Sequence, residues 1–459
     1  MKLDEIAEIN PWWKDKESIN NDDKIKAAQN SGIRWDRGQI FTYDKGIFSL
    51  RGPRQTGKTT WIKFRIRELL SRGIDPRSIL YLSCDKISDF KELANSLSEF
   101  KEWAKQDELF IFLDEISFVE EWQRGLKYLV DKGDLKKSTI IVTGSSSLDI
   151  TKSVERLPGR TGTGKRHFLF YPMTFREYVE ARGQLQDLLI KKDWIGDCQL
   201  YIKEINGLVI DYCKSGGISS AVPVFTHDKN IPTYIYDTYA AWITGDLAKA
   251  EKRENLSRQI IHKIIESYVS SLNWTNIAKV TAAESHSTIA DYVDTMEKLF
   301  FLQYVYTYAA HKKGAGFARN KKIYFADPFL FFLGIFMTRN IERPFEFCNE
   351  FLLSKENQGK LIEGIVLNSI VAELNRRTQR DDFDYKNYVF FWSDGTGEVD
   401  FVVSMDEKEP IGIEVKWRNK PQLKRYPFKR SLILTEKEYN PEKGFIPVGV
   451  FLLDPGRWI

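Results

Sequence analysis

The chain has 459 residues, of which 42% are hydrophobic, 14% aromatic and 29% charged. This composition predicts a folded protein of about three domains and excludes a largely disordered chain. The 68 basic and 64 acidic residues leave a net charge of only +4, so the bulk charge gives no argument for nucleic acid. The spacing of the 4 cysteines and 5 histidines matches no structural zinc motif. The first ten residues are not a signal peptide, and the longest apolar run, Phe329 to Met337, is too short for a membrane span. We therefore expect a cytoplasmic protein.

Short apolar runs recur at regular intervals in the first third of the chain. Residues 1–40 are polar apart from Pro11-Trp12-Trp13 and are expected to form an N-terminal arm. Between residues 41 and 172 the apolar runs alternate with helical stretches, which predicts an α/β domain whose parallel sheet is covered on both faces. The predicted strands are Ile47–Leu50, Ile79–Leu82, Leu109–Leu113, Thr139–Val142 and Phe168–Phe170.

Three further regions are expected after Pro172. Residues 173–265 have a helical pattern and predict a helical lid region. Residues 266–345 are typical of short helices followed by a hairpin, which predicts a winged-helix-like domain. Residues 355–459 are rich in strand patterns and predict a second α/β domain.

A phosphate-binding loop follows the first predicted strand. The sequence GPRQTGKTT, residues 52–60, matches G-x-x-x-x-G-K-[ST] between a strand and a helix, which is the context that this motif requires. Glycine at both motif positions lets backbone N–H groups turn toward phosphates, and the N-terminus of the helix adds positive potential. Lys58 is expected to reach the β- and γ-phosphates of ATP, and Thr59 to ligate Mg²⁺. The predicted nucleotide-binding residues are Gly52, Pro53, Arg54, Gln55, Thr56, Gly57, Lys58, Thr59 and Thr60.

Two carboxylates stand at the end of the third predicted strand. Asp114 is expected to hold the Mg²⁺ that accompanies ATP, and Glu115 to polarise the attacking water. One further strand, Ile79–Leu82, is expected between this strand and the loop. The strand after it ends in Thr143, whose hydroxyl could sense the γ-phosphate or orient water. A simple strand-end turn at Thr143 and an exposed helix-start carboxylate at Glu115 are the alternatives.

A second glycine-rich segment, GRTGTGK at residues 159–165, has the spacing of another phosphate loop. Arg166 stands where Ser or Thr is needed and no buried strand precedes the segment, so a second nucleotide site is rejected. Arg160 remains a candidate catalytic residue that reaches the γ-phosphate of the same or a neighbouring subunit, and a solvated arginine is the alternative. The sequence does not determine the oligomeric state.

The expected recognition helix of the winged-helix-like region, Ser287 to Leu299, has a poor charge for DNA. It carries Asp291, Asp294 and Glu297 against Lys298. A protein-contact or lid role therefore stands beside DNA binding. The basic, glycine-rich loop of the hairpin, residues 311–319, is the better candidate for contact with phosphates.

Acidic residues and a lysine gather in the C-terminal pattern. Glu414 and Lys416 lie two apart on a predicted strand and so share one face, where Asp400 from the preceding strand and Glu363 from a helix can join them. Such a set could bind a second Mg²⁺, or Mn²⁺, and activate water against a phosphodiester, as in the D…E-x-K arrangement of restriction-endonuclease-like nucleases. A structural cluster or an inactive relic is the alternative.

A basic segment with interleaved aromatic residues follows at once, WRNKPQLKRYPFKR at residues 417–430. This pattern favours phosphate contact and base stacking, and a solvated loop is the alternative. The predicted nucleic-acid contacts are Arg418, Lys420, Lys424, Arg425, Lys429 and Arg430.

Together these motifs resemble the prokaryotic AAA-type ATPases that carry a DUF4143-like C-terminal region. The matching segments include NPWW, GPRQTGKTT, FLDEI, TGSSS, LPGR, FYPMTFREYV, YFADP, LIEG, GEVDFVV and IEVK. The resemblance implies a P-loop NTPase core of the AAA+/ASCE type, a helical and winged-helix middle region and a C-terminal restriction-endonuclease-like domain, but it supplies no substrate. At residues 213–219 the chain has CKSGGIS where that family tends to have Gly-Gly-Phe-Pro, which leaves the local turn open.

We therefore expect an ATP-hydrolysing enzyme that acts on DNA and carries a nuclease-like domain. The alternative is a nucleotide-controlled switch or scaffold whose C-terminal domain binds DNA or a protein partner without cleavage. DNA-stimulated ATP turnover and an intact metal site would favour the enzyme.

Overall fold

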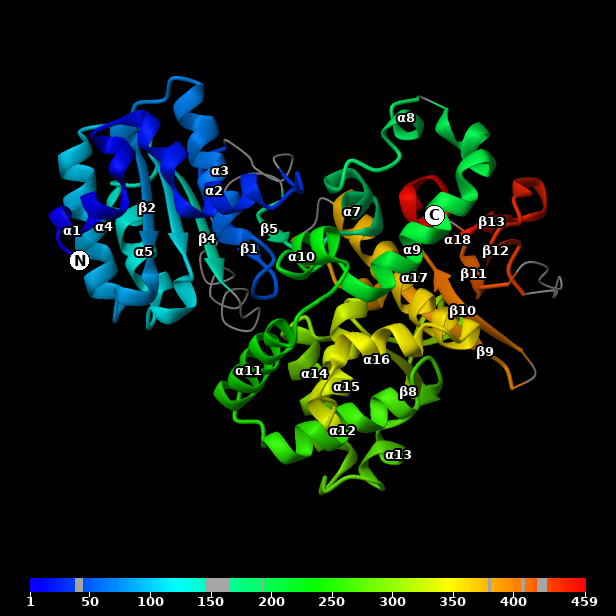
Figure 1. The fold of residues 1–459 in the computed structure, drawn as a ribbon. Coiled ribbons are helices and arrows are strands. Elements are labelled where there is room, and N and C mark those ends of the chain that lie inside the picture. The colour runs from blue at the N-terminus through cyan, green and yellow to red at the C-terminus, as the bar shows by residue number, and fades with distance from the viewer. Residues whose placement is uncertain are drawn as a thin grey trace. The chain divides into compact units, whose positions relative to one another are not determined.

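The computed structural model describes residues 1–37, 44–144, 165–191, 193–378, 381–395, 397–405, 409–418 and 427–459. The chain forms two compact units (Figure 1). The first comprises Met1–Tyr171 with Gln379–Asp381, and the second comprises Pro172–Thr378 with Asp382–Ile459. The first unit thus ends one residue before the predicted boundary at residue 172.

The first unit is built on a parallel sheet with strand order β2-β3-β4-β1-β5. The five predicted strands are confirmed within one or two residues, because a parallel strand buried on both faces is an almost continuous apolar run. The expected order is wrong in one respect. The strand between β1 and β3 is β4, and β2 lies at the edge of the sheet. A helical connection between two parallel strands allows the second strand to join either free edge, so the order along the chain does not determine the order in the sheet. The strands are β1 (Gly46–Arg51), β2 (Ile79–Ser83), β3 (Phe110–Asp114), β4 (Thr139–Gly144) and β5 (His167–Leu169).

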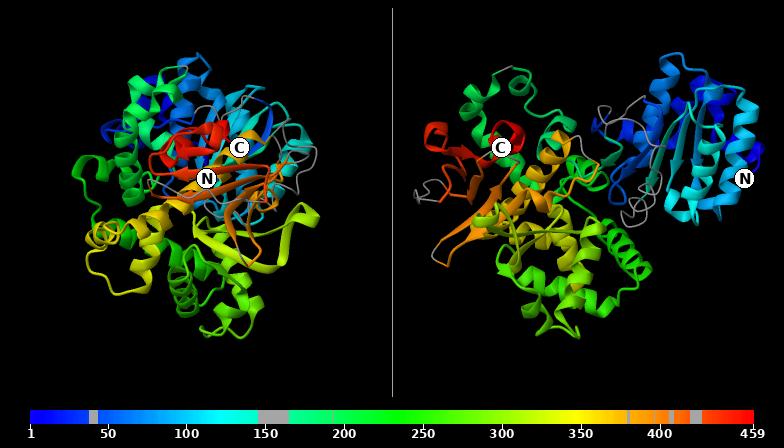
Figure 2. Two further views of the ribbon diagram at one scale, coloured as in Figure 1. Left: turned by 90° about the vertical axis from the view of Figure 1, so that its right-hand side faces the viewer. Right: turned by 180° about the vertical axis from the view of Figure 1, so that it is seen from behind.

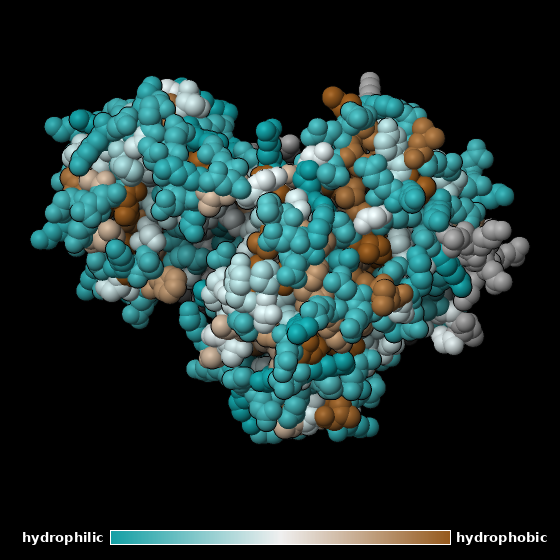
Figure 3. Space-filling model, in the orientation of Figure 1, coloured by the Kyte–Doolittle hydropathy of each residue, from teal (hydrophilic) through white to brown (hydrophobic). Residues whose placement is uncertain are grey.

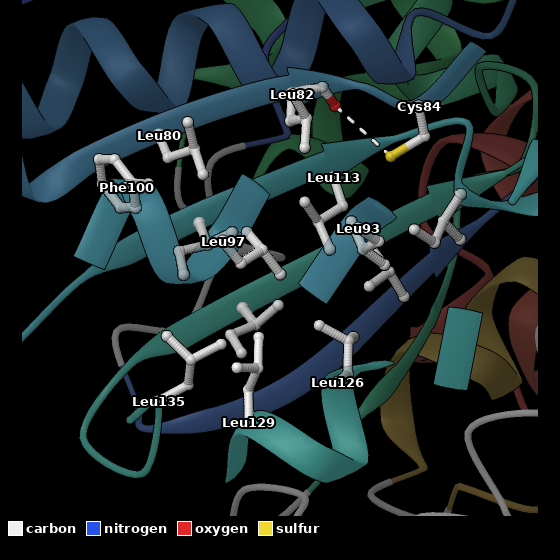
Figure 4. Close-up of a cluster of buried hydrophobic side chains, with 14 of the residues drawn as sticks. Leu80, Leu82, Cys84, Leu93, Leu97, Phe100, Leu113, Leu126, Leu129 and Leu135 are labelled. Carbon is white, nitrogen blue, oxygen red and sulfur yellow. Dashed lines mark hydrogen bonds between the residues drawn. The ribbon is translucent and has the colours of Figure 1, made fainter. Parts of the chain in front are cut away.

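Helices cover both faces of this sheet (Figures 1 and 2). Alternate strand residues point to opposite faces, so each face has its own hydrophobic core. On one face, Leu82 and Leu113 pack with Leu97 and Leu126 from α4 (Phe90–Ala104) and α5 (Trp122–Lys132), as Figure 4 shows. On the other face, α3 (Lys58–Ser71) contributes Trp61, Ile62 and Ile66 to a cluster with Phe48, Leu50 and Phe112.

Residues 1–37 are folded against the first unit. Trp12 is only 1% exposed, and its Nε1 donates to the carbonyl of Ile79 at 3.1 Å. Asn10 donates to the carbonyl of Tyr81 at 2.8 Å and accepts from the N–H of Tyr81 at 2.7 Å. The arm therefore satisfies polar backbone groups along the edge strand β2. Its helices are α1 (Leu3–Ile9), η1 (Pro11–Trp13), η2 (Lys16–Asn21) and α2 (Asp23–Asn30).

The second unit contains the helices from α7 to α18. The apolar run at residues 329–337 lies in α15, where nearly every side chain is buried. Among the described helices, none combines the length and the apolar character that crossing a membrane requires. Hydrophobic residues on the face drawn in Figure 3 are scattered among hydrophilic ones. The helices are α7 (Phe175–Ala181), α8 (Gln186–Leu189), α9 (Ile202–Ser215), α10 (Ala221–Asp228), α11 (Thr233–Lys249), α12 (Glu254–Glu266), α13 (Trp274–Ala278), α14 (His286–Lys298), α15 (Pro328–Thr338), α16 (Pro344–Phe351), α17 (Lys355–Arg377) and α18 (Val448–Leu453).

One sheet of order β13-β12-β11-β10-β9-β7-β8-β6 runs through the second unit. Its continuity depends on a short parallel pairing in which Tyr306 and Thr307 of β7 lie opposite Phe390 and Phe391 of β9. The regions predicted at 266–345 and 355–459 therefore share one sheet, because β9 pairs with an edge that the hairpin alone would leave open. The strands are β6 (Ser271–Leu272), β7 (Leu302–Ala309), β8 (Gly314–Phe325), β9 (Val389–Ser393), β10 (Glu398–Val403), β11 (Ile411–Lys416), β12 (Arg430–Thr435) and β13 (Phe445–Pro447).

Candidate nucleotide site and C-terminal carboxylate cluster

The phosphate-binding loop connects β1 to α3. Gly57 has a φ of 86° and precedes the first residue of the helix, Lys58. Gly52 is required for a different reason. A Cβ atom at Gly52 would lie 2.2 Å from the carbonyl oxygen of Phe170, the residue that follows β5. The loop therefore turns through Gly57 and packs closely against the end of β5 at Gly52, and the first-turn N–H groups of α3 are left to face an anion.

Lys58 is held inside the loop. Lys58 is only 5% exposed. Its Nζ donates to the carbonyl oxygens of Gly52 at 2.9 Å and of Pro53 at 2.8 Å. Both acceptors are neutral. Phosphate oxygens carry a charge and bind an ammonium more strongly, so a bound nucleotide can take Lys58 from these carbonyls.

Asp114 accepts hydrogen bonds from three hydroxyl groups near the loop. It is 3% exposed and accepts hydrogen bonds from Thr59 at 2.7 Å, Thr143 at 2.5 Å and Tyr81 at 3.1 Å. The Thr59 hydroxyl and the Asp114 carboxylate are hard oxygen ligands, which Mg²⁺ combines with phosphate oxygens and water. These two residues thus fit the predicted magnesium site.

Thr143 lies behind the two carboxylates. It is fully buried, donates to Asp114 Oδ1 and accepts from the N–H of Glu115 at 3.1 Å. Glu115 itself has a φ of 53°, which turns the chain sharply after β3. Thr143 therefore holds the Asp114–Glu115 pair in place through both of its hydrogen-bonding functions. This geometry goes beyond the strand-end turn that was the alternative.

Tyr81 belongs to this site although its sequence gave no motif. It lies on β2 opposite Phe112, and Ser83 lies opposite Asp114, so the alternation of the two strands puts Tyr81 and Asp114 on one side of the sheet. Burial, and next the charge of Asp114, raise the pKa of Tyr81, so its hydroxyl remains a donor. The Lys63 ammonium lies 3.6 Å above the Tyr81 ring and 3.2 Å from Asp22. The pairing of β2 with β3 was the signal that could have identified Tyr81.

Several predicted site residues lie outside the described part of the chain. They are Arg160 in the second glycine-rich segment and Lys420, Lys424 and Arg425 in the basic segment. The other members of the basic segment are described. Arg418 is exposed, Lys429 pairs with Glu409 at 2.9 Å, and Arg430 donates to the carbonyl of Trp458 at 2.6 Å.

The C-terminal carboxylates are arranged around an unexpected lysine. Lys322 on β8 is 1% exposed, and its ammonium contacts Glu363 at 3.1 Å, Asp400 at 3.1 Å and Glu398 at 2.5 Å. Tyr324, two residues further along β8, donates to Glu363 at 2.7 Å. Sequence reasoning named Glu363 and Asp400 but missed Lys322, because its partners lie 41 and 78 positions away.

The predicted convergence of Glu363, Asp400, Glu414 and Lys416 on one metal stays a prediction, and the structure adds Lys322 to this set. Lys416 pairs with Glu414 on their shared strand face, as the spacing predicted. Glu363 and Asp400 meet at Lys322, and the charges of Asp400 and Lys322 both act on the carboxyl group of Glu414, which therefore lies near them. Among the residues that the structure describes, no group of three or more His, Cys, Asp or Glu side chains is arranged to hold a metal ion.

The acidic residues of α14 are engaged within the second unit. Asp291 pairs with Lys252, Asp294 accepts from the hydroxyl of Tyr304 at 2.7 Å, and Glu297 pairs with Lys386 at 3.2 Å. Lys252 and Lys386 thus partly neutralise the negative charge that made this helix a poor DNA contact.

The hairpin and the basic segment lie close together. Tyr308, near the end of β7, contacts Phe428 with ring centroids 6.0 Å apart. Hydrogen bonding to Lys429, then the charges of Lys429 and of Lys313 in the hairpin loop, lower the pKa of Glu409. Phe317, in the hairpin strand after this loop, is 66% exposed. The hairpin and the described end of the basic segment, residues 427–430, therefore lie close together.

Three family models match this chain. Residues 44–179 match a model described as an AAA domain, and residues 358–448 match a domain of unknown function, DUF4143. Residues 206–336 match a second domain of unknown function, DUF8612. The first match contains the complete phosphate-binding loop and both of its carboxylates. The second contains Glu363, Asp400, Glu414 and Lys416.

Two curated relatives are similar in sequence. An uncharacterised protein of Methanocaldococcus jannaschii is 26% identical over 293 residues, which is 59% of this chain and 58% of the relative. An uncharacterised protein of Haemophilus influenzae is 24% identical over 290 residues, or 60% of this chain and 66% of the relative. The matches thus span less than two-thirds of either relative.

Solved structures of ATPases are similar only at a low level. The ORC2 protein of Aeropyrum pernix, in ADPNP and ADP complexes, has a TM-score of 0.35 at 11% identity, covering 70% of this chain and 92% of that one. AMPPCP-bound DnaA of Aquifex aeolicus has a TM-score of 0.26 at 15% identity, covering 61% and 86%. These similarities are too low to transfer any function.

Proposed function

We propose that the first unit, which matches an AAA domain model in a chain that also matches DUF4143, binds ATP with Mg²⁺ and hydrolyses it to ADP and phosphate. The observation that carries this proposal is the meeting of Thr59 and Asp114, whose oxygen atoms lie 2.7 Å apart at the N-terminus of α3. A metal ligand from the loop and one from the strand end are thus already adjacent.

Each residue of this site has a separate role in the proposal. The ammonium group of Lys58 leaves the loop carbonyls, forms hydrogen bonds with the β- and γ-phosphates and balances their charge. Glu115 accepts a proton from the water that attacks the γ-phosphate. Mg²⁺, held by Thr59 and Asp114, would neutralise charge on the phosphates. Arg160 is proposed to reach the γ-phosphate from the same or a neighbouring subunit.

We further propose that the second unit binds nucleic acid. The order α12, β6, α13, α14, β7, β8, with β8 pairing to both β6 and β7, supports a winged-helix fold. Its hairpin loop carries exposed Lys312 and Lys313, and the adjacent strand carries exposed Phe317. Lys429 joins them through their common neighbour Glu409. Basic side chains beside an exposed aromatic ring form the kind of surface on which a phosphate backbone and a base can rest.

One experiment tests both parts of this proposal. ATP turnover of the full chain is measured with Mg²⁺, alone and with single-stranded DNA, double-stranded DNA or RNA of equal length. We expect turnover without nucleic acid and faster turnover with at least one of the three. If ATP is not hydrolysed under any condition, the ATPase proposal fails. If turnover is equal throughout and no nucleic acid binds, the nucleic-acid proposal fails and the nucleotide-controlled scaffold remains.

A further inference from the structure

We propose that Lys322 takes the place of a divalent cation in the C-terminal carboxylate cluster, and that this domain therefore does not cut a phosphodiester. The inference goes beyond the proposed function, because it concerns chemistry that is separate from ATP hydrolysis. It rests on the contacts of a single buried ammonium group.

The hydrogen-bonding capacity of this ammonium is fully used. A lysine has three N–H donors, and the three carboxylates in contact with Lys322 are those of Glu363, Glu398 and Asp400. Each N–H can therefore serve one carboxylate. A divalent cation bound between the same carboxylates would occupy the position that Nζ occupies.

The oxygens of Asp400 are also engaged. Oδ1 accepts from Lys322 at 3.1 Å, and Oδ2 accepts from the backbone N–H of Val415 at 2.8 Å. A Mg²⁺ site of the expected kind needs Asp400 as a ligand beside Glu414. Glu414 pairs with Lys416 through Oε1, and only its buried Oε2 lacks a partner among the described residues. Lys322 and the Val415 N–H thus hold Asp400 with Oδ1 turned toward an ammonium group.

Lys322 also connects three elements that are distant in the sequence. It lies on β8 of the hairpin, Glu363 lies on α17, and Asp400 lies on β10, while β7 and β9 separate β8 from β10 in the sheet. Removal of one partner from such a buried pair leaves an uncompensated charge, which is strongly destabilising. The lysine therefore fixes the hairpin to the C-terminal strands, where a metal-dependent nuclease would need an open position for metal and water.

Replacement of Lys322 tests this idea directly. The full chain carrying Asp114→Asn, which removes the magnesium ligand of the ATP site, is compared with the same chain carrying in addition Lys322→Met. We expect that Lys322→Met opens the carboxylates to a cation, so millimolar Mn²⁺ should raise its unfolding midpoint by about 5 °C. The parent chain should shift by less than about 1 °C, because its cluster already holds a cation.

A control variant removes a partly buried lysine that pairs elsewhere in the same unit. Lys386 pairs with one carboxylate, that of Glu297, so Lys386→Met should lower stability without creating a response to Mn²⁺. A folded Lys322→Met variant that does not respond to Mn²⁺ overturns the proposal.

A measurement on the parent chain keeps the proposal testable if Lys322→Met does not fold. Mn²⁺ binding is titrated by electron paramagnetic resonance, and we expect no site that is lost on Asp400→Asn or Glu414→Gln. Cleavage of single- and double-stranded DNA with Mg²⁺ or Mn²⁺ is assayed with the wild-type chain, and we expect none. A Mn²⁺ site that depends on Asp400 or Glu414, or metal-dependent cutting that Lys416→Ala abolishes, overturns the proposal.

Discussion

The hydroxyl of Thr59 donates to Asp114 Oδ2 at 2.7 Å, and this bond joins the first turn of α3 to the end of β3. In the proposed function, Mg²⁺ bound with ATP would take both oxygens as ligands, directly or through water, and would replace this hydrogen bond. The same carboxylate is held from behind by Thr143 and Tyr81. Nucleotide binding therefore requires little movement of Asp114.

Glu115→Gln should retain ATP and lose its hydrolysis. The amide has nearly the same shape but cannot accept a proton from water, and general-base catalysis contributes about 10² to 10⁴ in rate. We expect turnover to fall by at least about 100-fold, measured as phosphate release, while binding of a fluorescent ATP analogue changes little. Hydrolysis by Glu115→Gln at the wild-type rate would exclude Glu115 as the base.

Lys58→Ala should instead weaken nucleotide binding. The ammonium that balances the β- and γ-phosphates is lost, and a charged hydrogen bond of this kind contributes about 1.5–3 kcal/mol. The dissociation constant for ATP should therefore rise by roughly 10- to 100-fold, as measured by titration calorimetry. Unchanged affinity would show that Lys58 stays with the carbonyls of Gly52 and Pro53 in the bound state.

Tyr81→Phe tests whether Tyr81 positions Asp114. The variant keeps the ring but removes the donor at 3.1 Å from the carboxylate, which costs about 1 kcal/mol for one hydrogen bond. We expect the Mg²⁺ concentration for half-maximal turnover to rise by roughly 5-fold, with little change in the KM for ATP. Tyr212→Phe, which removes a buried hydroxyl bonded to Met173 in the second unit, is the control. An equal Mg²⁺ requirement in wild type and Tyr81→Phe would leave Tyr81 a packing role only.

The first unit was largely predictable from sequence, and the reason is local. Strands buried on both faces appear as apolar runs, and the carboxyl ends of parallel strands meet at one edge, so Asp114 and Thr143 were expected near the loop. The position of β2 at the edge was not predictable, because the sequence of a crossover helix does not indicate which edge of the sheet the next strand joins. Tyr81 was missed for another reason, because a tyrosine within an apolar strand belongs to no motif even where that strand is expected beside β3.

The second unit shows where such reasoning stops. The alternation of β8 puts Lys322 and Tyr324 on one face, but only the tertiary structure shows that this face meets α17 and β10. The sequence therefore indicated a carboxylate cluster but not the buried lysine that contacts it. The pairing of β7 with β9 was also hidden, because one parallel stretch of two residue pairs leaves no pattern in either strand.

Removal of charge from the hairpin and the basic segment tests the proposed nucleic-acid surface. Lys312, Lys313 and Lys429 are replaced together by Ser, which removes three exposed cations and leaves Arg430, bonded to Trp458, in place. Each lost phosphate contact should reduce the slope of log affinity against log salt by about 0.7–0.9. We expect weaker binding and a flatter slope in fluorescence anisotropy.

The control for this variant uses lysines of the first unit with similar surroundings. Lys45, Lys132 and Lys137 are 52%, 53% and 61% exposed in their side chains, and each pairs with an acidic residue, as Lys429 does. Their replacement by Ser should leave the slope unchanged. Equal effects of the two triple variants would mean that only net charge matters and that no defined surface exists.

Asp327 predicts a pH dependence of stability in the second unit. It is 1% exposed, caps α15 by accepting from the N–H of Phe329 at 2.8 Å, and accepts from the N–H of Gly217 at 2.7 Å. The departure CKSGGIS thus keeps the glycines that this contact needs, because a Cβ at Gly216 would lie 1.8 Å from Asp327 Oδ1. Burial raises the pKa of Asp327 from 3.8 to about 7, although both backbone hydrogen bonds act in the opposite direction.

The sign of the effect follows from linkage. The folded state holds the proton of Asp327 up to about pH 7, whereas the unfolded chain releases it near pH 3.8. The contribution of this group to stability is therefore complete below pH 3.8 and is lost as the pH rises through 7, by up to about 4 kcal/mol. The amide side chain at position 327 of the Asp327→Asn variant does not titrate. The variant should therefore be less stable than the wild type at pH 5, and this difference in the free energy of unfolding should become smaller toward pH 8.

Urea unfolding of both chains at several pH values between 5 and 8 measures this deficit. Glu92→Gln is the control, because hydrogen bonds to the backbone and hydroxyl of Ser88 and to the N-terminal ammonium lower the pKa of Glu92 to about 2. Glu92 is therefore ionised in both states between about pH 6 and 7, below the range in which the N-terminal ammonium loses its proton, and its deficit should stay constant there. A constant or widening deficit for Asp327→Asn would mean that the two N–H donors outweigh burial and that Asp327 is ionised in the folded protein.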